Sequence, residues 1–216
     1  MTEEEWLTTT DNPRDMLEHL EQRVSHRKWR LFLCGCSRGV WHILTDHVGR
    51  RTTEAAEQYA DGLITGDELS RVQQEENVRL HATDRKSPLW HAVAGALGAT
   101  YLDTKEEFDC AYWATDEFVQ SVSDEDAEHA RQCELLRDIF GNPFRPVTFS
   151  AEWRTDTAVS LARTMYESRE FSAMPILADA LQDAGCDDPD ILDHCRDAKQ
   201  IHVRGCWVVD LVLGKS

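Results

Sequence analysis

The sequence predicts an all-α protein in which several helices form a compact bundle. Apolar residues recur at helical spacing through most of the 216 residues. Many of these stretches begin with a side chain that caps helices, followed by proline or acidic residues. No stretch has a convincing strand partner, and no unit of about 20–50 residues repeats, so neither a sheet nor a solenoid is expected.

The first predicted helices follow this pattern closely. Pro13 after Asn12 marks a helix start, since proline is favoured at the first helical position. The most apolar candidate is a single helix over residues 27–48, "RKWRLFLCGCSRGVWHILTDHV". Gly35 and Gly39 lie inside it, although glycine weakens a helix, so we expect another helix to pack closely there.

Residues 59–69, "YADGLITGDEL", resemble half of a calcium-binding EF-hand loop. If Gly62 took the invariant glycine position, Tyr59 would occupy a position that needs an oxygen ligand. A bend between two helices accounts for the stretch better. Gly62 then ends one helix, and Thr65 with Glu68 forms the capping box of the next. Calcium is not expected.

Further helices are predicted over residues 87–102, 104–122 and 124–140. The first of these is rich in small residues and is expected to be buried. The prolines of "GNPFRPVTFS" then forbid a helix over residues 141–150. This loop joins an N-terminal helical part, residues 1–140 with an acidic middle layer, to a C-terminal helical part, residues 141–216. We expect the two parts to fold as one domain. The C-terminal part holds four more stretches that favour helix, at 155–168, 174–186, 188–195 and 206–215, with a loop at 198–205.

Charge and composition exclude several function classes. The formal net charge is −17, and only residues 23–51 carry an excess of basic side chains. Direct nucleic-acid binding is therefore not expected, because phosphate contacts need clustered Lys and Arg. We expect the basic segment to pair with the acidic middle of the chain. No export signal or apolar span is visible, so a cytoplasmic protein with seven free cysteines and no membrane contact is expected.

Two known types of site are also excluded by their motifs. No Glu-x-x-His pair exists for a di-iron bundle, and no glycine-rich loop precedes Lys-Ser/Thr for nucleotide binding.

The stretches "LLRDIFGNPFRPV", "LADALQDAGC", "ILDHCR" and "HVRGCWVVDLVLGK" resemble a family of bacterial proteins to which no activity is assigned. The resemblance covers roughly residues 3–66 and 131–215 and implies kinship alone. Its members more often carry "CACCRR" where this chain has "CGCSR", which weakens a ligand role for the first two cysteines.

Metal binding is the sharpest chemical hypothesis. Soft ligands occur at Cys34 and Cys36 with His42, and again in the group His194, Cys195, His202 and Cys206. No cofactor is expected from the sequence, and zinc is the metal that such ligands would suit. On one helix, however, Cys34 and Cys36 would point about 200° apart, which does not suit one ion. The alternative is that these cysteines are small buried apolar residues.

Four residues are candidates for binding a partner or ligand: Phe144, Arg145, Arg204 and Trp207. Arginine on a rigid loop suits recognition of carboxylate or phosphate, or else forms a salt bridge, for instance with Asp138 or Asp210. We expect Phe144 to insert near Trp207.

No catalytic constellation is visible, so the leading hypothesis is a non-enzymatic protein-binding or adaptor module whose partner has a basic surface. The alternative is a small metal- or ligand-binding enzyme that uses the Cys and His residues. A third hypothesis, an acidic mimic of nucleic acid, needs a continuous negative face along residues 103–134.

Overall fold

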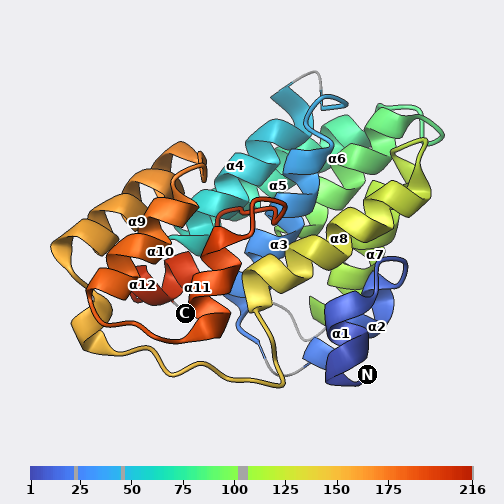
Figure 1. Cartoon of the computed structure of the whole chain (residues 1–216). Coiled ribbons are helices and arrows are strands. Elements are labelled where there is room, and N and C mark those ends of the chain that lie inside the picture. The colour runs from blue at the N-terminus through green and yellow to red at the C-terminus, as the bar shows by residue number, and fades with distance from the viewer. Residues whose placement is uncertain (22–23, 45–46, 102–106, 216) are drawn as a thin grey trace. The chain divides into compact units, whose positions relative to one another are not determined.

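The predicted fold class is confirmed. The computed structural model describes residues 1–21, 24–44, 47–101 and 107–215, and this part of the chain contains helices and no strand. The helices are α1 (Glu3–Thr8), α2 (Pro13–Leu20), α3 (His26–Gly39), α4 (His47–Ala60), α5 (Gly66–His81), α6 (Pro88–Gly98), α7 (Glu107–Gln120), α8 (Glu125–Phe140), α9 (Asp156–Ser168), α10 (Met174–Asp183), α11 (Pro189–Arg196) and α12 (Trp207–Leu213), with the 3-10 turn η1 (Ala151–Trp153) before α9 (Figure 1).

The chain divides into two compact units, residues 1–136 and 137–216. The division falls inside α8, a few residues before the boundary that the prolines of the 141–150 loop indicate. Among the described residues, no helix combines the length and the apolar character that crossing a membrane requires.

In the first unit α3 is the central helix. Nine of its residues are buried, and it packs against α4, α6 and α7 (Figure 1). The small residues of α6 let it approach α7 closely, because a methyl group at Gly98 would collide with Ala114. The expectation of a buried small-residue helix is therefore confirmed. The predicted start of the helix at 104–122 lies outside the described residues, and the described helix there is α7.

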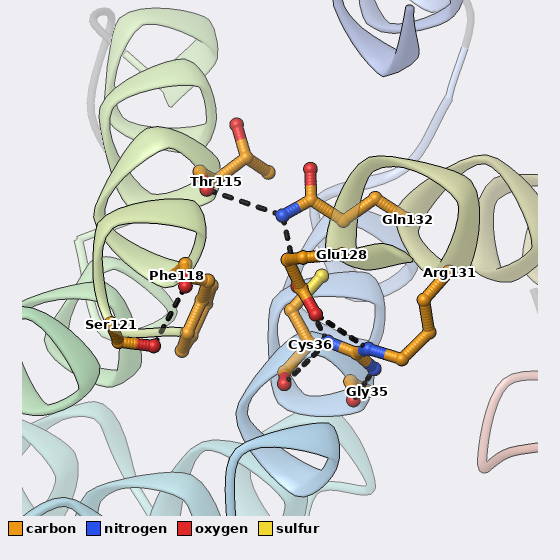
Figure 2. Close-up of polar contacts among 8 residues, drawn as sticks. All are labelled: Gly35, Cys36, Thr115, Phe118, Ser121, Glu128, Arg131 and Gln132. Atoms are coloured by element: carbon orange, nitrogen blue, oxygen red, sulfur yellow. Dashed lines mark hydrogen bonds and ion pairs between the residues drawn. The ribbon is translucent and has the colours of Figure 1, made fainter. Parts of the chain in front are cut away.

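The single helix predicted over residues 27–48 is wrong. Helix α3 ends at Gly39, hydrogen-bonded turns follow, and α4 begins at His47. Arg131 of α8 supplies the physical reason. Its guanidinium donates to the carbonyl oxygens of Gly35, at 3.1 Å, and of Cys36, at 2.9 Å (Figure 2). These carbonyls lie in the last turn of α3, where a cation both satisfies the acceptors and opposes the negative end of the helix dipole.

The same arginine explains why Gly39 is required. A methyl group at residue 39 would collide with the guanidinium of Arg131. Arg131 is held in turn by Glu128, whose two oxygens accept at 2.8 and 2.7 Å, and Gln132 links Glu128 to the Thr115 carbonyl (Figure 2). What approaches α3 closely at Gly39 is therefore the guanidinium of Arg131 from α8. The close helix packing expected at the α3 glycines is not shown there.

The stretch that resembles an EF-hand is a bend, as predicted. Gly62 has φ 69°, a left-handed conformation that glycine adopts at low cost, and it ends α4. The amide of Thr65 donates to Glu68 Oε2 at 2.8 Å, and the amide of Glu68 donates to Thr65 Oγ1 at 3.3 Å. Both hydrogen bonds of the capping box are therefore present at the start of α5.

Much of the basic segment is paired with acidic side chains of the same unit. Arg38 forms a two-pronged ion pair with Glu57, and Arg51 pairs with Glu75. Arg27 lies 3.7 Å from Asp61. The expectation that positive and negative stretches would pair is confirmed at these positions.

The second unit has its own apolar core. Helices α9, α10, α11 and α12 supply it, and Figure 1 shows them grouped together. Helix α8 ends at Gly141, as predicted, and the loop over residues 142–150 then leads to η1. The last apolar segment is a helix, α12, rather than a strand.

Candidate metal centre

Four side chains of the second unit converge on one point. Asp138 comes from the end of α8, His194 from α11, His202 from the loop that follows α11, and Cys206 is the N-cap residue of α12. One potential ligand atom from each residue lies within 4.8 Å of all the others. These four side chains could therefore hold a metal ion, and no other such group of three or more His, Cys, Asp or Glu residues occurs among the described residues.

Local structure explains why His194 reaches this point. Asp188 caps the start of α11 by accepting from the amides of Asp190 and Ile191. The helix then buries Ile191, Leu192 and Cys195 in the apolar core. His194 lies between the buried residues and the surface, and its side chain is 10% exposed.

A tight turn brings His202 and Cys206 together. The amide of Cys206 donates to the Val203 carbonyl at 2.9 Å, and Gly205 has φ 95°, which L side chains rarely adopt. The end of α8 holds this turn in place, because the amide of Val203 donates to Asp138 Oδ2 at 2.9 Å. The glycine suggested a turn from the sequence, and here the turn creates the pair of ligands.

The distances suit a tetrahedral ion. Asp138 Oδ1 lies 2.9 Å from His202 Nδ1 and 3.3 Å from His194 Nε2. Cys206 Sγ lies 3.3 Å from His194 Nε2 and 3.9 Å from His202 Nδ1. Zinc bonds of about 2.0–2.3 Å in a tetrahedron place neighbouring ligand atoms roughly 3.3–3.6 Å apart. Only small adjustments of these side chains would be needed to accept such an ion.

The site is buried, and burial affects the pKa of its ionisable side chains. The side chain of Asp138 is inaccessible, and that of His202 is 7% exposed. Burial opposes ionisation of Asp138, but the hydrogen bonds from His194 and His202 outweigh it and hold its pKa below the ordinary value. Burial, reinforced by the Asp138 charge, raises the pKa of the Cys206 thiol well above its usual range. A divalent cation would neutralise one carboxylate and one thiolate together.

Neighbouring groups fix the ligands in place. The Val203 amide occupies the second oxygen of Asp138, which leaves Oδ1 to face the histidines. The His194 ring lies 5.2 Å from Trp207 and 5.0 Å from His202, and Phe171 lies beside His202. Such outer contacts orient metal ligands and exclude water.

The sequence-based candidates divide clearly. His202 and Cys206, expected as ligands, are brought together, and His194 joins them. Cys195 belongs to the apolar core. Cys34 and Cys36 belong to the first unit and to no ligand group among the described residues. Cys34 is buried and its thiol donates to the Thr53 carbonyl, and burial raises the pKa of both thiols.

Asp138 was missed as a ligand, because the sequence suggested it only as a salt-bridge partner. A signal was present. An acidic residue in the last turn of a helix meets the negative end of the helix dipole, so it needs a compensating partner. The compensation comes from two histidines and one backbone amide.

The expected partner-binding residues differ in accessibility. Arg204 donates to the Tyr166 carbonyl and lies over the Tyr166 ring, so it is bound within the second unit. Gly141 lies against the Trp207 ring, and Phe144 is partly buried. The insertion of Phe144 near Trp207 stays a prediction. The Arg145 side chain is 57% exposed and lies 3.8 Å from Asp190.

The hypothesis of an acidic mimic stays a prediction, since Asp116, Asp124, Glu125 and Asp126 are exposed in the described part of residues 103–134 and two other acidic residues are buried. Glu117 and Glu128 are buried there, and they pair with His91 and Arg131. Residues 103–106 lie outside the described part of the chain.

Comparison with known proteins adds no relative. No family model matches the chain, and neither a curated protein nor a solved structure matches it significantly. The resemblance to a bacterial family remains a prediction.

Proposed function

We propose that residues 137–216 form a zinc-binding module in which the metal has a structural role. The observation that carries the proposal is the meeting of four potential ligand atoms from four separate places in this unit, all within 4.8 Å. Three of these positions, His194, His202 and Cys206, lie on α11, the following loop and the start of α12. Asp138 comes from the end of α8, so one ion would tie together four separate segments of this unit.

The donor set favours zinc over other common ions. It consists of two imidazole nitrogens, one thiolate and one carboxylate oxygen, whereas calcium and magnesium prefer oxygen ligands throughout. A non-haem iron centre of the two-histidine, one-carboxylate type keeps positions open, and here Cys206 would fill one of them.

The number of ligands argues for structure rather than catalysis. Structural zinc sites have four protein ligands, whereas catalytic sites keep a position for water or substrate. Asp138 and Cys206 are also buried completely, so a substrate would have no direct approach to them. The enzyme hypothesis based on these residues is therefore the weaker one.

A non-catalytic metal is consistent with a protein-binding or adaptor role, which we propose as the function of the chain. The partly buried Phe144 and the exposed Arg145 follow Gly141 in the loop, and Gly141 lies against Trp207, next to the proposed ligand Cys206. Metal binding would hold the base of this loop. The net charge of −17 favours a partner with a basic surface.

Metal analysis tests the zinc site. The full chain, purified without a His-tag, should contain one zinc ion, and Cys206→Ala should contain none. Cys195→Ala is the matched control, because Cys195 is a buried cysteine of the same unit that belongs to the core. Zinc-free wild-type protein after growth with zinc, or zinc retained by Cys206→Ala, would refute the site.

Chemical crosslinking in cells tests the adaptor role. A specific crosslinked partner should be lost in Phe144→Ala/Arg145→Ala and kept in Arg163→Ala, an exposed change on α9. A partner crosslinked equally by both variants would contradict binding at this loop.

A further inference from the structure

A hollow of about 640 Å³ lies in the first unit, far along the chain from the metal ligands. Its walls are formed by Trp41, Arg50, Arg51, Glu54 and Arg79. These residues come from the turn after α3, from α4 and from α5. Three of these five residues are arginines, in a chain whose net charge is −17.

The three arginines differ in their ion-pair partners. Arg51 pairs with Glu75 and lies 3.8 Å from Glu76, and Arg79 lies 3.2 Å from the same Glu76. Arg50 has no carboxylate partner among the described residues. Its Nη2 donates to the Trp41 carbonyl at 2.9 Å, and its guanidinium lies 5.0 Å from the centre of the Trp41 ring.

Arg50 also carries an unsatisfied donor. Its Nε is buried and has no hydrogen-bond partner in the described structure. A buried donor without an acceptor costs free energy, and in native proteins it commonly indicates a missing water or ion. The guanidinium is held by the Trp41 carbonyl in one orientation, so its remaining donors are positioned in advance for an acceptor.

The position of Arg50 and Arg51 points to the charge of that acceptor. Both lie near the start of α4, where the helix dipole favours negative charge. The first turn of α4 contains no acidic residue. An anion in the hollow would interact favourably with the arginines and with this end of the helix.

We propose that this hollow binds an oxyanion of the phosphate class. Arginine presents a planar fork of donors that matches two phosphate oxygens, and Arg50 is the principal contact. Arg51 and Arg79, whose charges are offset by Glu75 and Glu76, add hydrogen-bond donors. The volume lies within the range of small-molecule sites and far exceeds a bare phosphate, so a phosphate monoester is the expected source, with Glu54 accepting from one of its hydroxyl groups.

Binding can be measured on the full chain by titration calorimetry and by thermal shift. The probes are glycerol 3-phosphate, inorganic phosphate, and sodium chloride at equal ionic strength. Glycerol 3-phosphate should bind saturably and raise Tm, and tighter binding of the ester than of inorganic phosphate would assign the ester as the source. Equal binding of both would assign free phosphate to the same site.

Variants locate the anion. Arg50→Gln should weaken binding by about tenfold or more, the effect expected for loss of one charge-assisted hydrogen bond. Arg79→Gln, at a half-exposed position on α5, provides a second variant should Arg50→Gln fold poorly. Arg71→Gln is the matched control, since Arg71 is exposed on the same helix and outside the hollow. A response no larger than that to chloride, or full affinity in both pocket variants, would overturn the proposal. Neither result depends on the zinc site.

Discussion

His202 Nδ1 lies 2.9 Å from Oδ1 of Asp138, although the two residues are 64 positions apart in the chain. The adjacent Val203 amide donates to the other oxygen of the same carboxylate. The loop after α11 is thereby attached to the end of α8 at two points. Each prediction for the second unit depends on this attachment.

Asp138→Asn should weaken zinc binding by more than about 100-fold. The change removes the negative charge that faces both histidines, and the loss of outer-sphere partners alone typically costs about 10–100-fold in affinity. Competition with a chromogenic zinc chelator measures the effect. Asp179→Asn is the control, because the Asp179 side chain is 72% exposed and pairs only with the surface of α11. Equal affinity in both variants would remove Asp138 from the ligand set.

Removal of zinc should destabilise the second unit and leave the first nearly unchanged. The free energy of binding a structural zinc ion is also folding free energy, and 1 kcal/mol shifts Tm by about 4–8 °C in a domain of this size. We expect calorimetry of the full chain to show one transition that falls by about 10 °C or more after chelation. Added zinc should restore it and magnesium should not. A scan that chelation does not alter would exclude a structural role.

Gly39→Ala should destabilise the first unit by about 1–3 kcal/mol, the usual cost of overpacking. Its methyl group would displace the Arg131 guanidinium from the carbonyls of Gly35 and Cys36. Urea denaturation followed by circular dichroism gives the free energy of unfolding. In Gly66→Ala the nearest side-chain atom is 3.8 Å from the new methyl group, so that variant should be neutral or more stable. Comparable losses in the two variants would show that Arg131 has no special role.

Thr65→Ala should cost about 1 kcal/mol of unfolding free energy, because Thr65 caps α5. Urea denaturation measures this loss, and Ser70→Ala, in the interior of the same helix, serves as the control. Thermal scans with added calcium should show no stabilisation of the wild-type chain. A calcium-dependent rise in Tm that disappears in Asp61→Ala/Glu68→Ala would instead establish an ion site at the bend.

Much of the helical order was predictable because its signals are local. Pro13 after Asn12, the Thr65–Glu68 capping box and Gly141 each act on residues within one or two turns. The one large error, a helix over residues 27–48, has a cause that is not local. Arg131 satisfies the last carbonyls of α3 from nearly 100 residues away, and no pattern within α3 contains that information.

For the metal centre, the sequence by itself determined the ligand types and the pair His202 and Cys206, since both lie on one short segment around Gly205. Only the tertiary structure shows that Asp138 joins the histidines and Cys206, and that Cys34 and Cys36 belong to no such group among the described residues. The physical reason is that helical period and capping depend on neighbours in the chain. A coordination sphere depends instead on which distant side chains the packed core brings within a few ångströms of one another.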